Sequence, residues 1–390
     1  MIDFSLTEKD QQLLDQVRAE ALVCRKYARY YDENEGEFIP DVFPEADDFP
    51  SVYAHLAGRT ENDTSMPVIS MLLSAGQTWG DYSVRLRRAK GGLGNAALRA
   101  SGTPEQYEKW KGLTLAMAIT EPGCGSDPSK VQTTAALDGN EWVINGEKIF
   151  VTTGCKAEGV VVWATTDRSA GRAGIKSFLI EKGTPGFVVA RKEKKLGIRA
   201  DDTAAYVFKD CRIPRANLLG GDESISKQSS GGFKGVLKTF NMTRPAVAAG
   251  GLGMAQAALD FTRDQLREAG IAIEYGGRVH GQSAAVAKFL ELEALVEAAE
   301  LTILRAAWLS GESKSNNLEA SVCKAKTGTV VRQVTQGCID LLGPMGVSRE
   351  HLLEKWFRDV RITDIYEGTG EIQRMITARE LLGYTRAELS

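Results

Sequence analysis

The sequence contains no proline between Pro245 and Pro344, and this stretch is rich in alanine. An interior proline costs a helix about 3 kcal/mol, so a long proline-free stretch permits long helices. Apolar residues recur in it near a 3.6-residue period, which predicts the buried face of a helix. These residues are Val286, Phe289, Leu290, Leu292, Val296 and Leu301. Gly343 and Pro344 then predict the end of a further helix at Leu342.

The N-terminal part also has the pattern of helices. A capping box over residues 5–8 predicts a helix start, and an apolar face follows it. The residues of that face are Leu13, Leu14, Val17 and Ala21. Thr103 followed by Pro104 predicts a second helix start, with proline at the first helical position.

From residue 114 to 222 the pattern changes to short β-forming runs. In EWVINGEKIFVTTG, β-formers flank Asn145-Gly146, which predicts a hairpin with a type I′ turn. Four further runs follow at short spacing, as in a small antiparallel barrel or sandwich. Residues 220–232 are rich in glycine and serine and predict a linker.

The predicted fold class is mainly α with a central β domain. We expect an N-terminal helical domain at 1–113, a β-barrel domain at 114–222 and a C-terminal helical bundle at 223–390. Apolar residues make up 43% and charged residues 25%, the mixture of a soluble globular protein. No apolar window approaches the twenty residues of a membrane span, so no membrane partner is expected. The N-terminal segment is polar and acidic, which predicts a cytoplasmic location.

Charge and metal-ligating residues narrow the function. The net charge is −3, from 48 basic and 51 acidic residues, so nucleic acid is not expected as a partner. The six cysteines are scattered without a C-x-x-C pair and predict free thiols of a reducing compartment. The three histidines lack metal-ligand spacing, so no metal site is expected. A carboxylate or a cofactor must therefore carry any proton chemistry.

Three motifs point to one family: ITEPGCGSD at 119–127, VINGEKIFVTTG at 143–154 and IYEGTGEIQR at 365–374. Together with segments 91–106 and 239–260, they resemble the acyl-CoA dehydrogenases in order and spacing. The resemblance runs from about residue 90 to the C-terminus. It implies helical, β-barrel and four-helix-bundle domains, one FAD per subunit and usually a homotetramer, with a dimer as the alternative.

Glu367 is the catalytic residue that this resemblance implies. Dehydrogenation of a saturated acyl thioester needs a base for the α proton while an acceptor takes hydride from the β carbon. Burial raises a carboxylate's pKa and makes it a stronger base. Gly368 lets the backbone approach a substrate closely. The Glu367 N–H is expected to bind the thioester carbonyl. The alternative is a surface glutamate at a turn before a helix.

The resemblance also implies a set of FAD-binding residues. Pro122 and two glycines make 119–127 a tight loop whose N–H groups can meet an anion or a flavin edge. The Phe-Val-Thr of 150–152 matches the family's Trp-Ile-Thr, with the ring expected on a flavin face and the Thr hydroxyl near N5. An ordinary core aromatic is the alternative for Phe150. The expected cofactor-binding residues are Met117, Ile119, Thr120, Ser126, Phe150, Val151, Thr152, Asp340, Gly343, Thr369 and Glu371.

Substrate binding is implied for a second set. Asn241 and Arg244 lie three residues apart on one helical face, which the family uses for the CoA pantetheine. A solvated residue at a helix start is the alternative for Arg244. The expected substrate-binding residues are Ser126, Phe240, Asn241, Arg244, Tyr366 and Gly368.

Several positions depart from the family pattern. Ala272 stands where the family has the arginine that meets the FAD pyrophosphate of a neighbouring subunit. Asp340 replaces a glutamine near the FAD adenine, and Glu371 stands where glutamine is common. A Pro-Glu-x-Tyr-Gly-Gly loop expected upstream of residue 90 is absent.

The leading hypothesis is an FAD-dependent acyl-CoA dehydrogenase that forms a trans-2-enoyl-CoA. An electron-transfer flavoprotein would then reoxidise the cofactor. An acyl-CoA oxidase, a non-catalytic FAD-binding subunit of a hetero-oligomer and the family's DNA-associated branch are the alternatives. Near-neutral charge disfavours the last. Straight, branched, cyclic and steroid acyl groups stay open.

Overall fold

The computed structural model describes residues 4–40, 65–84, 92–225, 231–278 and 281–384, with residues 43, 45, 63 and 388; at 231–242 only the backbone is described. The chain divides into two compact units. Unit 1 comprises Met1–Arg87, Lys195–Ala200 and Asn241–Ser390, and unit 2 comprises Arg88–Lys194 and Asp201–Phe240. The boundaries at residues 113 and 222 stay a prediction.

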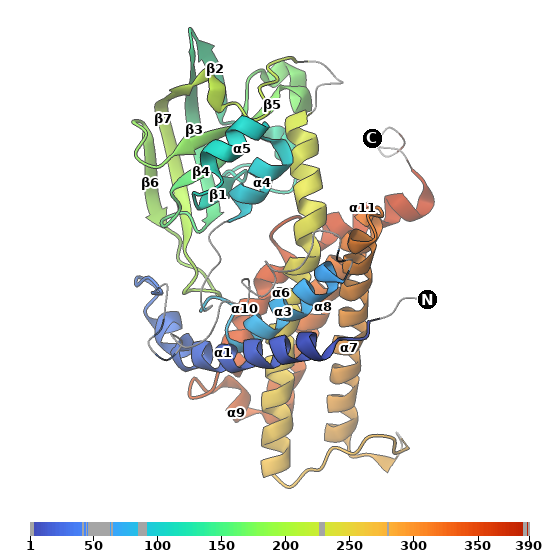
Figure 1. Cartoon of the computed structure of the whole chain (residues 1–390). Helices are drawn as coiled ribbons and strands as arrows, with labels where there is room; N and C mark the ends of the chain where they lie inside the picture. Colours follow the sequence, from blue (N-terminus) through green and yellow to red (C-terminus); the bar gives the residue numbers. More distant parts are fainter. Residues whose placement is uncertain are drawn as a thin grey trace. The chain divides into compact units, whose positions relative to one another are not determined.

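Unit 2 is built on a seven-stranded sheet with the order β1-β4-β2-β3-β7-β6, in which β5 pairs with β4. Most neighbours are antiparallel as predicted, but β4 runs parallel to both β1 and β2. The strands are β1 Leu115–Ala118, β2 Thr134–Asp138, β3 Glu141–Thr152, β4 Gly159–Thr165, β5 Ile175–Glu181, β6 Phe187–Lys192 and β7 Thr203–Pro214. Helices α4 Leu93–Ser101 and α5 Pro104–Trp110 belong to the same unit, and α4 contacts β1 (Figure 1).

The hairpin predicted at Asn145-Gly146 is wrong. Strand β3 runs through both residues, and the β2–β3 turn lies at Gly139, whose φ is 59°. Gly146 serves a close approach instead, because an added Cβ would lie 2.5 Å from Thr133 Oγ1. A shift in the β3–β7 register occurs between Ile144 and Gly146. The Asn-Gly pair therefore marks a β-bulge within a strand.

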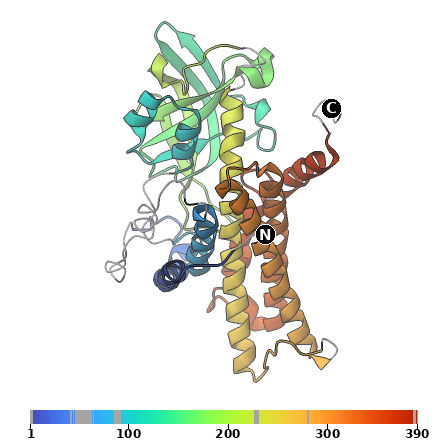
Figure 2. The ribbon, with the colours of Figure 1, turned by 45° about the vertical axis from the view of Figure 1, so that its right-hand side comes forward.

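Unit 1 is helical. Its helices are α1 Glu8–Glu33, α3 Met66–Gly80, α6 Gly231–Glu268 from residue 241 on, α7 Ala284–Gly311, α8 Asn317–Leu342, α9 Pro344–Val347, α10 Leu353–Asp359 and α11 Gly370–Leu382. Between α10 and α11 lies the short 3-10 helix η6, Val360–Asp364. Figure 2 shows α6, α7 and α8, from yellow to dark orange, running alongside one another. One hydrophobic core draws residues from all three.

Several details of the helices differ from the sequence expectations. The capping box of α1 is formed by Thr7 and Asp10, two residues further along the chain than the predicted box at 5–8. On α7, Leu301 is 48% exposed, because the buried face passes through Ala299 and Ile303. The predicted helix end at Leu342 is confirmed, with Gly343 as the cap. Within the predicted linker, residues 226–230 lie outside the described residues.

A buried ion network fastens a loop and two helical segments of unit 1. The Lys355 ammonium of α10 donates to Asp81 at 2.5 Å and to Asp359 at 2.6 Å, and all three side chains are fully buried. Asp359 also accepts from the backbone N–H of Ile198, and Asp81 accepts from that of Val84. Each charged group of the network thus has hydrogen-bond partners, which a buried charge requires.

We expect Lys355→Met to lower the free energy of unfolding by about 3–5 kcal/mol, because two buried carboxylates lose their cation. The exposed Lys288–Glu291 pair on α7 supplies the control. Lys288→Met should change the same quantity by less than about 1 kcal/mol. Denaturant unfolding followed by circular dichroism measures both. Equal effects of the two substitutions would contradict a stabilising role for the network.

Candidate functional site

Glu367 lies in the turn between η6 and α11. Its φ is 54°, a conformation that residues other than glycine rarely adopt. The next residue, Gly368, has a φ of 92°, and an added Cβ there would lie 2.4 Å from Gln373 Nε2. Two successive positive φ angles reverse the chain before Thr369, whose hydroxyl caps α11. Such strain persists where surrounding contacts hold it, and it clusters at functional sites.

Two buried side chains, one on α8 and one on α11, donate hydrogen bonds to the backbone of this turn. Gln373 Nε2 of α11 donates to the carbonyl oxygens of Glu367 and Gly368, at 3.2 Å each. Lys324 Nζ of α8 donates to Gly368 O at 2.7 Å and to Thr363 O at 3.1 Å. Among the described residues, no acceptor lies within hydrogen-bonding range of the Glu367 N–H. That N–H is therefore available to a ligand.

The Glu367 carboxylate is half-buried, which excludes the alternative of an ordinary surface glutamate. Thr243 Oγ1 of α6 donates to Glu367 Oε2 at 2.5 Å. Burial raises the pKa of the Glu367 carboxyl, and the Thr243 hydrogen bond and the charges of Lys324 and Arg244 oppose this rise. The net direction is upward, so the group is a stronger base than an exposed glutamate.

Arg244 is 3% exposed and lies within the body of α6, so the alternative of a solvated helix-start residue is wrong. Burial lowers the pKa of its guanidinium, and the charge of Glu367 acts in the opposite direction. Tyr366 is half-buried, and its hydroxyl is hydrogen-bonded to that of Tyr82. The side chains of Phe240 and Asn241 lie outside the described residues.

In unit 2 a buried ion pair anchors the 119–127 loop. Lys148 of β3 donates to Glu121 Oε1 at 2.7 Å and to Ile119 O at 3.0 Å. Glu121 also accepts from the N–H and the hydroxyl of Thr133. Burial lowers the pKa of Lys148 to about 8, against the charge of Glu121. Both side chains are nearly inaccessible to solvent, so the loop is pinned to β3 from inside.

Phe150 stands at the end of β3 in a strained and exposed position. Its φ is 56°, at a register shift between Lys148 and Val151, and 59% of the residue is exposed. It is therefore not an ordinary core aromatic. The neighbouring Thr152 is exposed, whereas Val151 is buried. A large exposed ring held at a cost in backbone energy suggests a ligand-binding role.

The remaining expected residues are distributed over both units. In unit 2, Met117, Ile119 and Thr120 are half-buried and Ser126 is exposed. In unit 1, Asp340 is exposed and accepts from Gln336. Asp340 and Lys324 are 16 positions apart on α8, about 24 Å along the axis, so Asp340 and Gly343 lie far from the Glu367 turn. Thr369 adjoins the turn, and Glu371 is exposed beside it.

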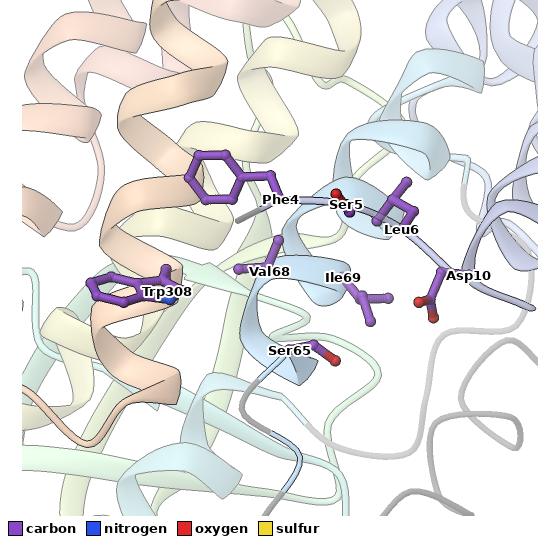
Figure 3. A pocket seen from close by; sticks show the side chains of 8 residues that line it. All are labelled: Phe4, Ser5, Leu6, Asp10, Ser65, Val68, Ile69 and Trp308. Atoms are coloured by element: carbon purple, nitrogen blue, oxygen red, sulfur yellow. The ribbon is translucent and has the colours of Figure 1, made fainter. Parts of the chain in front are cut away.

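The structure also contains a small pocket in unit 1 (Figure 3). It is lined by Phe4, Ser5, Leu6, Asp10, Ser65, Val68, Ile69 and Trp308, none of which is a candidate site residue. Among the described residues, no group of three or more His, Cys, Asp or Glu side chains could hold a metal ion. No helix of the described chain has the length and apolarity to cross a membrane.

Comparison with protein families accounts for this arrangement. Residues 116–211 match the acyl-CoA dehydrogenase middle domain, and residues 230–382 match the acyl-CoA dehydrogenase C-terminal domain. The chain belongs to the acyl-CoA dehydrogenase family. Membership confirms the predicted fold and the predicted reaction class, acyl-CoA dehydrogenation.

Similar proteins cover most of the chain. The rat mitochondrial short-chain specific acyl-CoA dehydrogenase is 35% identical over 82% of this chain and 79% of its own length. The structure of butyryl-CoA dehydrogenase from Megasphaera elsdenii has a TM-score of 0.81 and 29% identity, covering 98% of this chain and all of that one. A chain from a structural study of the electron transferring flavoprotein of Acidaminococcus fermentans has a TM-score of 0.78 and 29% identity, with the same coverage.

Sequence reasoning missed five residues that hold candidate segments of this family member, two in unit 2 and three in unit 1. They are Glu121, Lys148, Thr243, Lys324 and Gln373. One signal was available for Lys324: it falls among the small and apolar residues of the buried face of α8, where an unpaired lysine is rare. The others carry no comparable signal, because their partners come from other segments of the chain.

We expect Lys148→Met to loosen the 119–133 segment, because the buried Glu121 carboxylate loses its cation. Amide hydrogen exchange in that segment should quicken by about tenfold or more. Lys130, exposed in the same segment, supplies the control, and Lys130→Met should leave exchange unchanged. Exchange in Lys148→Met equal to that of the control would show that the pair does not anchor the loop.

Proposed function

We propose that this family member catalyses the FAD-dependent α,β-dehydrogenation of a short-chain acyl-CoA to the trans-2-enoyl-CoA, with Glu367 as the base. The observation that carries the proposal is the Glu367 turn. It presents a half-buried carboxylate of raised pKa next to a backbone N–H without an acceptor in the described structure. These are the two groups that removal of a proton next to a thioester carbonyl requires.

The chain's own residues divide the work at the α carbon. Thr243 occupies Glu367 Oε2, which leaves Oε1 to accept the α proton. The Glu367 N–H donates to the thioester carbonyl oxygen, where negative charge develops as the proton leaves. Gly368 permits the close approach of the backbone. Arg244 and Lys324 keep part of the surroundings positive while the carboxylate is charged.

The residues of unit 2 fit a flavin cofactor. An exposed ring at Phe150 offers an apolar surface to a planar heterocycle, and the exposed Thr152 hydroxyl offers it a hydrogen bond. The 119–127 loop adds exposed Gly125 and Ser126, and a Cβ on Gly125 would meet nothing within 4 Å. We therefore infer that these residues bind FAD. When bound, FAD supplies the acceptor for the hydride of the β carbon.

The substrate class follows from the relatives. The rat enzyme is specific for short-chain acyl-CoA, and the Megasphaera structure is of a butyryl-CoA dehydrogenase. We therefore propose a short-chain acyl-CoA such as butyryl-CoA. The binding roles of Ser126, Phe240, Asn241, Arg244, Tyr366 and Gly368 stay proposals, as do the cofactor roles of Asp340, Gly343, Thr369 and Glu371.

We propose an electron-transfer flavoprotein as the electron acceptor, supported by the likeness to a chain from the Acidaminococcus study. A homotetramer is proposed from the family resemblance. A cytoplasmic location stays a prediction, which the free state of all six cysteines supports. Reoxidation by oxygen at the full turnover rate would favour the alternative of an acyl-CoA oxidase.

Glu367→Gln tests the base. FAD content should stay normal, and anaerobic bleaching of the flavin by butyryl-CoA should slow by about 10²–10⁴-fold. In the wild type the bleaching rate should rise with pH, because the base must be deprotonated. The rise should lie above the range of an ordinary carboxyl, since burial raises the pKa of Glu367. Glu380→Gln, which changes an exposed carboxylate on α11 outside the candidate site residues, is the control. If Glu367→Gln bleaches at the wild-type rate, a residue other than Glu367 is the base.

Phe150→Ala tests the cofactor site. The wild type should purify with a flavin absorption spectrum, and Phe150→Ala should bind FAD about three- to tenfold more weakly, as expected for loss of one aromatic stack. Leu137→Ala removes another exposed apolar side chain of the same sheet and should leave the FAD affinity unchanged. A wild type that binds no added FAD would overturn the cofactor assignment. Equal FAD affinities of the wild type and Phe150→Ala would show that Phe150 does not contribute to the FAD site.

A further inference from the structure

Lys324 is buried in unit 1, although it neither donates nor accepts a proton in the proposed reaction. Its side chain is fully inaccessible on α8, and its ammonium donates to two backbone carbonyls. Those carbonyls belong to Thr363 and Gly368, which bracket the segment that contains Glu367. A neutral carbonyl compensates only part of the cost of burying an ammonium. A lysine is therefore an expensive choice at a position that needs only a donor.

We propose that Lys324 is a positioning residue for the Glu367 base: it clamps the two ends of the strained turn and supplies a buried positive charge to the Glu367 carboxylate. The inference rests on the proposed role of Glu367. Two independent features carry it, the pair of hydrogen bonds to the turn and the charge relation between the two side chains.

The clamp acts on backbone conformation. Gly368 O accepts from both Lys324 and Gln373, so the peptide after the base is held from two sides. Thr363 O is held by Lys324 alone among the described side chains. Helix α8 is long and packs against α7 and α11, so it holds Lys324 in a fixed position. Through its two hydrogen bonds, Lys324 in turn restrains the backbone of the turn. Without it, the hydrogen bonds of Gln373 and Thr243 remain to oppose relaxation of the positive φ of Glu367.

The charge acts on the base. The groups that face Lys324 electrostatically are Glu367, Asp364, Arg244 and Cys323. Asp364 already pairs with Arg332 at 3.0 Å, whereas the Glu367 carboxylate has the uncharged Thr243 hydroxyl as its hydrogen-bond partner. Burial lowers the pKa of Lys324 to about 8, and Glu367 acts to raise it. Removing Lys324 leaves Arg244 as the remaining cation that lowers the pKa of Glu367.

Three variants separate the two effects. Lys324→Met removes the charge and the donors, Lys324→Gln keeps a donor but removes the charge, and Lys324→Arg keeps the charge. The matched control is Lys326→Met, which changes an exposed lysine two positions along α8. Each variant is loaded with FAD, and its fold is checked by circular dichroism.

The first readout is the pH profile of anaerobic flavin bleaching by butyryl-CoA. Lys324→Met and Lys324→Gln should shift the rising limb to higher pH by about one unit, because a nearby cation has been lost. Lys324→Arg should keep the rising limb at the same pH as in the wild type, because the positive charge remains. Its bleaching rate should be lower, since the larger planar guanidinium does not reproduce the two hydrogen bonds of the ammonium to the turn. Rates for Lys324→Met should fall about tenfold or more. An unshifted limb in both uncharged variants would overturn the electrostatic role.

The second readout does not depend on activity. Hydrogen exchange of residues 363–369 should quicken in Lys324→Met and stay at the wild-type rate in Lys326→Met. Unchanged exchange would overturn the clamp. If Lys324→Met does not fold, Lys324→Gln carries the electrostatic test and Lys324→Arg the clamp test. A wild type that acyl-CoA does not bleach would refute the proposed function, while the exchange data would still decide the clamp.

Discussion

The positive φ of Glu367 is the constraint that the surrounding helices of unit 1 satisfy. A glutamate with a φ of 54° has no intrinsic reason to stay there, so neighbouring segments must hold it. Helix α8 contributes Lys324, α11 contributes Gln373 and α6 contributes Thr243. Helices α6 and α8 share one hydrophobic core with α7, and α11 packs against α8, so packing outside the turn fixes its shape. The packing of these helices thus offsets the backbone strain at Glu367.

Unit 2 uses a related device. Phe150 also has a positive φ, and it is two residues from a fully buried lysine, Lys148. There the ammonium pairs with Glu121 and fixes the 119–127 loop to the strand that carries the ring. In both units an internal lysine supports backbone in an unusual conformation. A lysine suits this task, because its long stem packs among apolar groups while one ammonium serves several acceptors.

The helices and the β region could be predicted because each has a local signature. The cap at Thr103, the end of α8 at Gly343 and the apolar face around Phe289 were all correct. The hairpin at Asn145-Gly146 failed for a physical reason. Glycine is required there by the approach of Thr133 from another segment, and a turn and a close approach look the same in a sequence. Leu301 failed because Ala299 and Ile303 continue the buried face in its place.

The sequence by itself determined the chemical candidates: Glu367 with its glycine, the exposed-loop motif at 119–127 and the aromatic at 150. Only the tertiary structure decided which groups surround them. From helices distant in the chain, Lys324 bonds to Gly368 and Thr243 bonds to Glu367, and Lys148 of β3 reaches Glu121 in the loop after β1. Periodicity records that a residue is buried, but it does not record its partner. Burial, charge and strain at the base arise from those long-range contacts, and they exist only once the chain has folded.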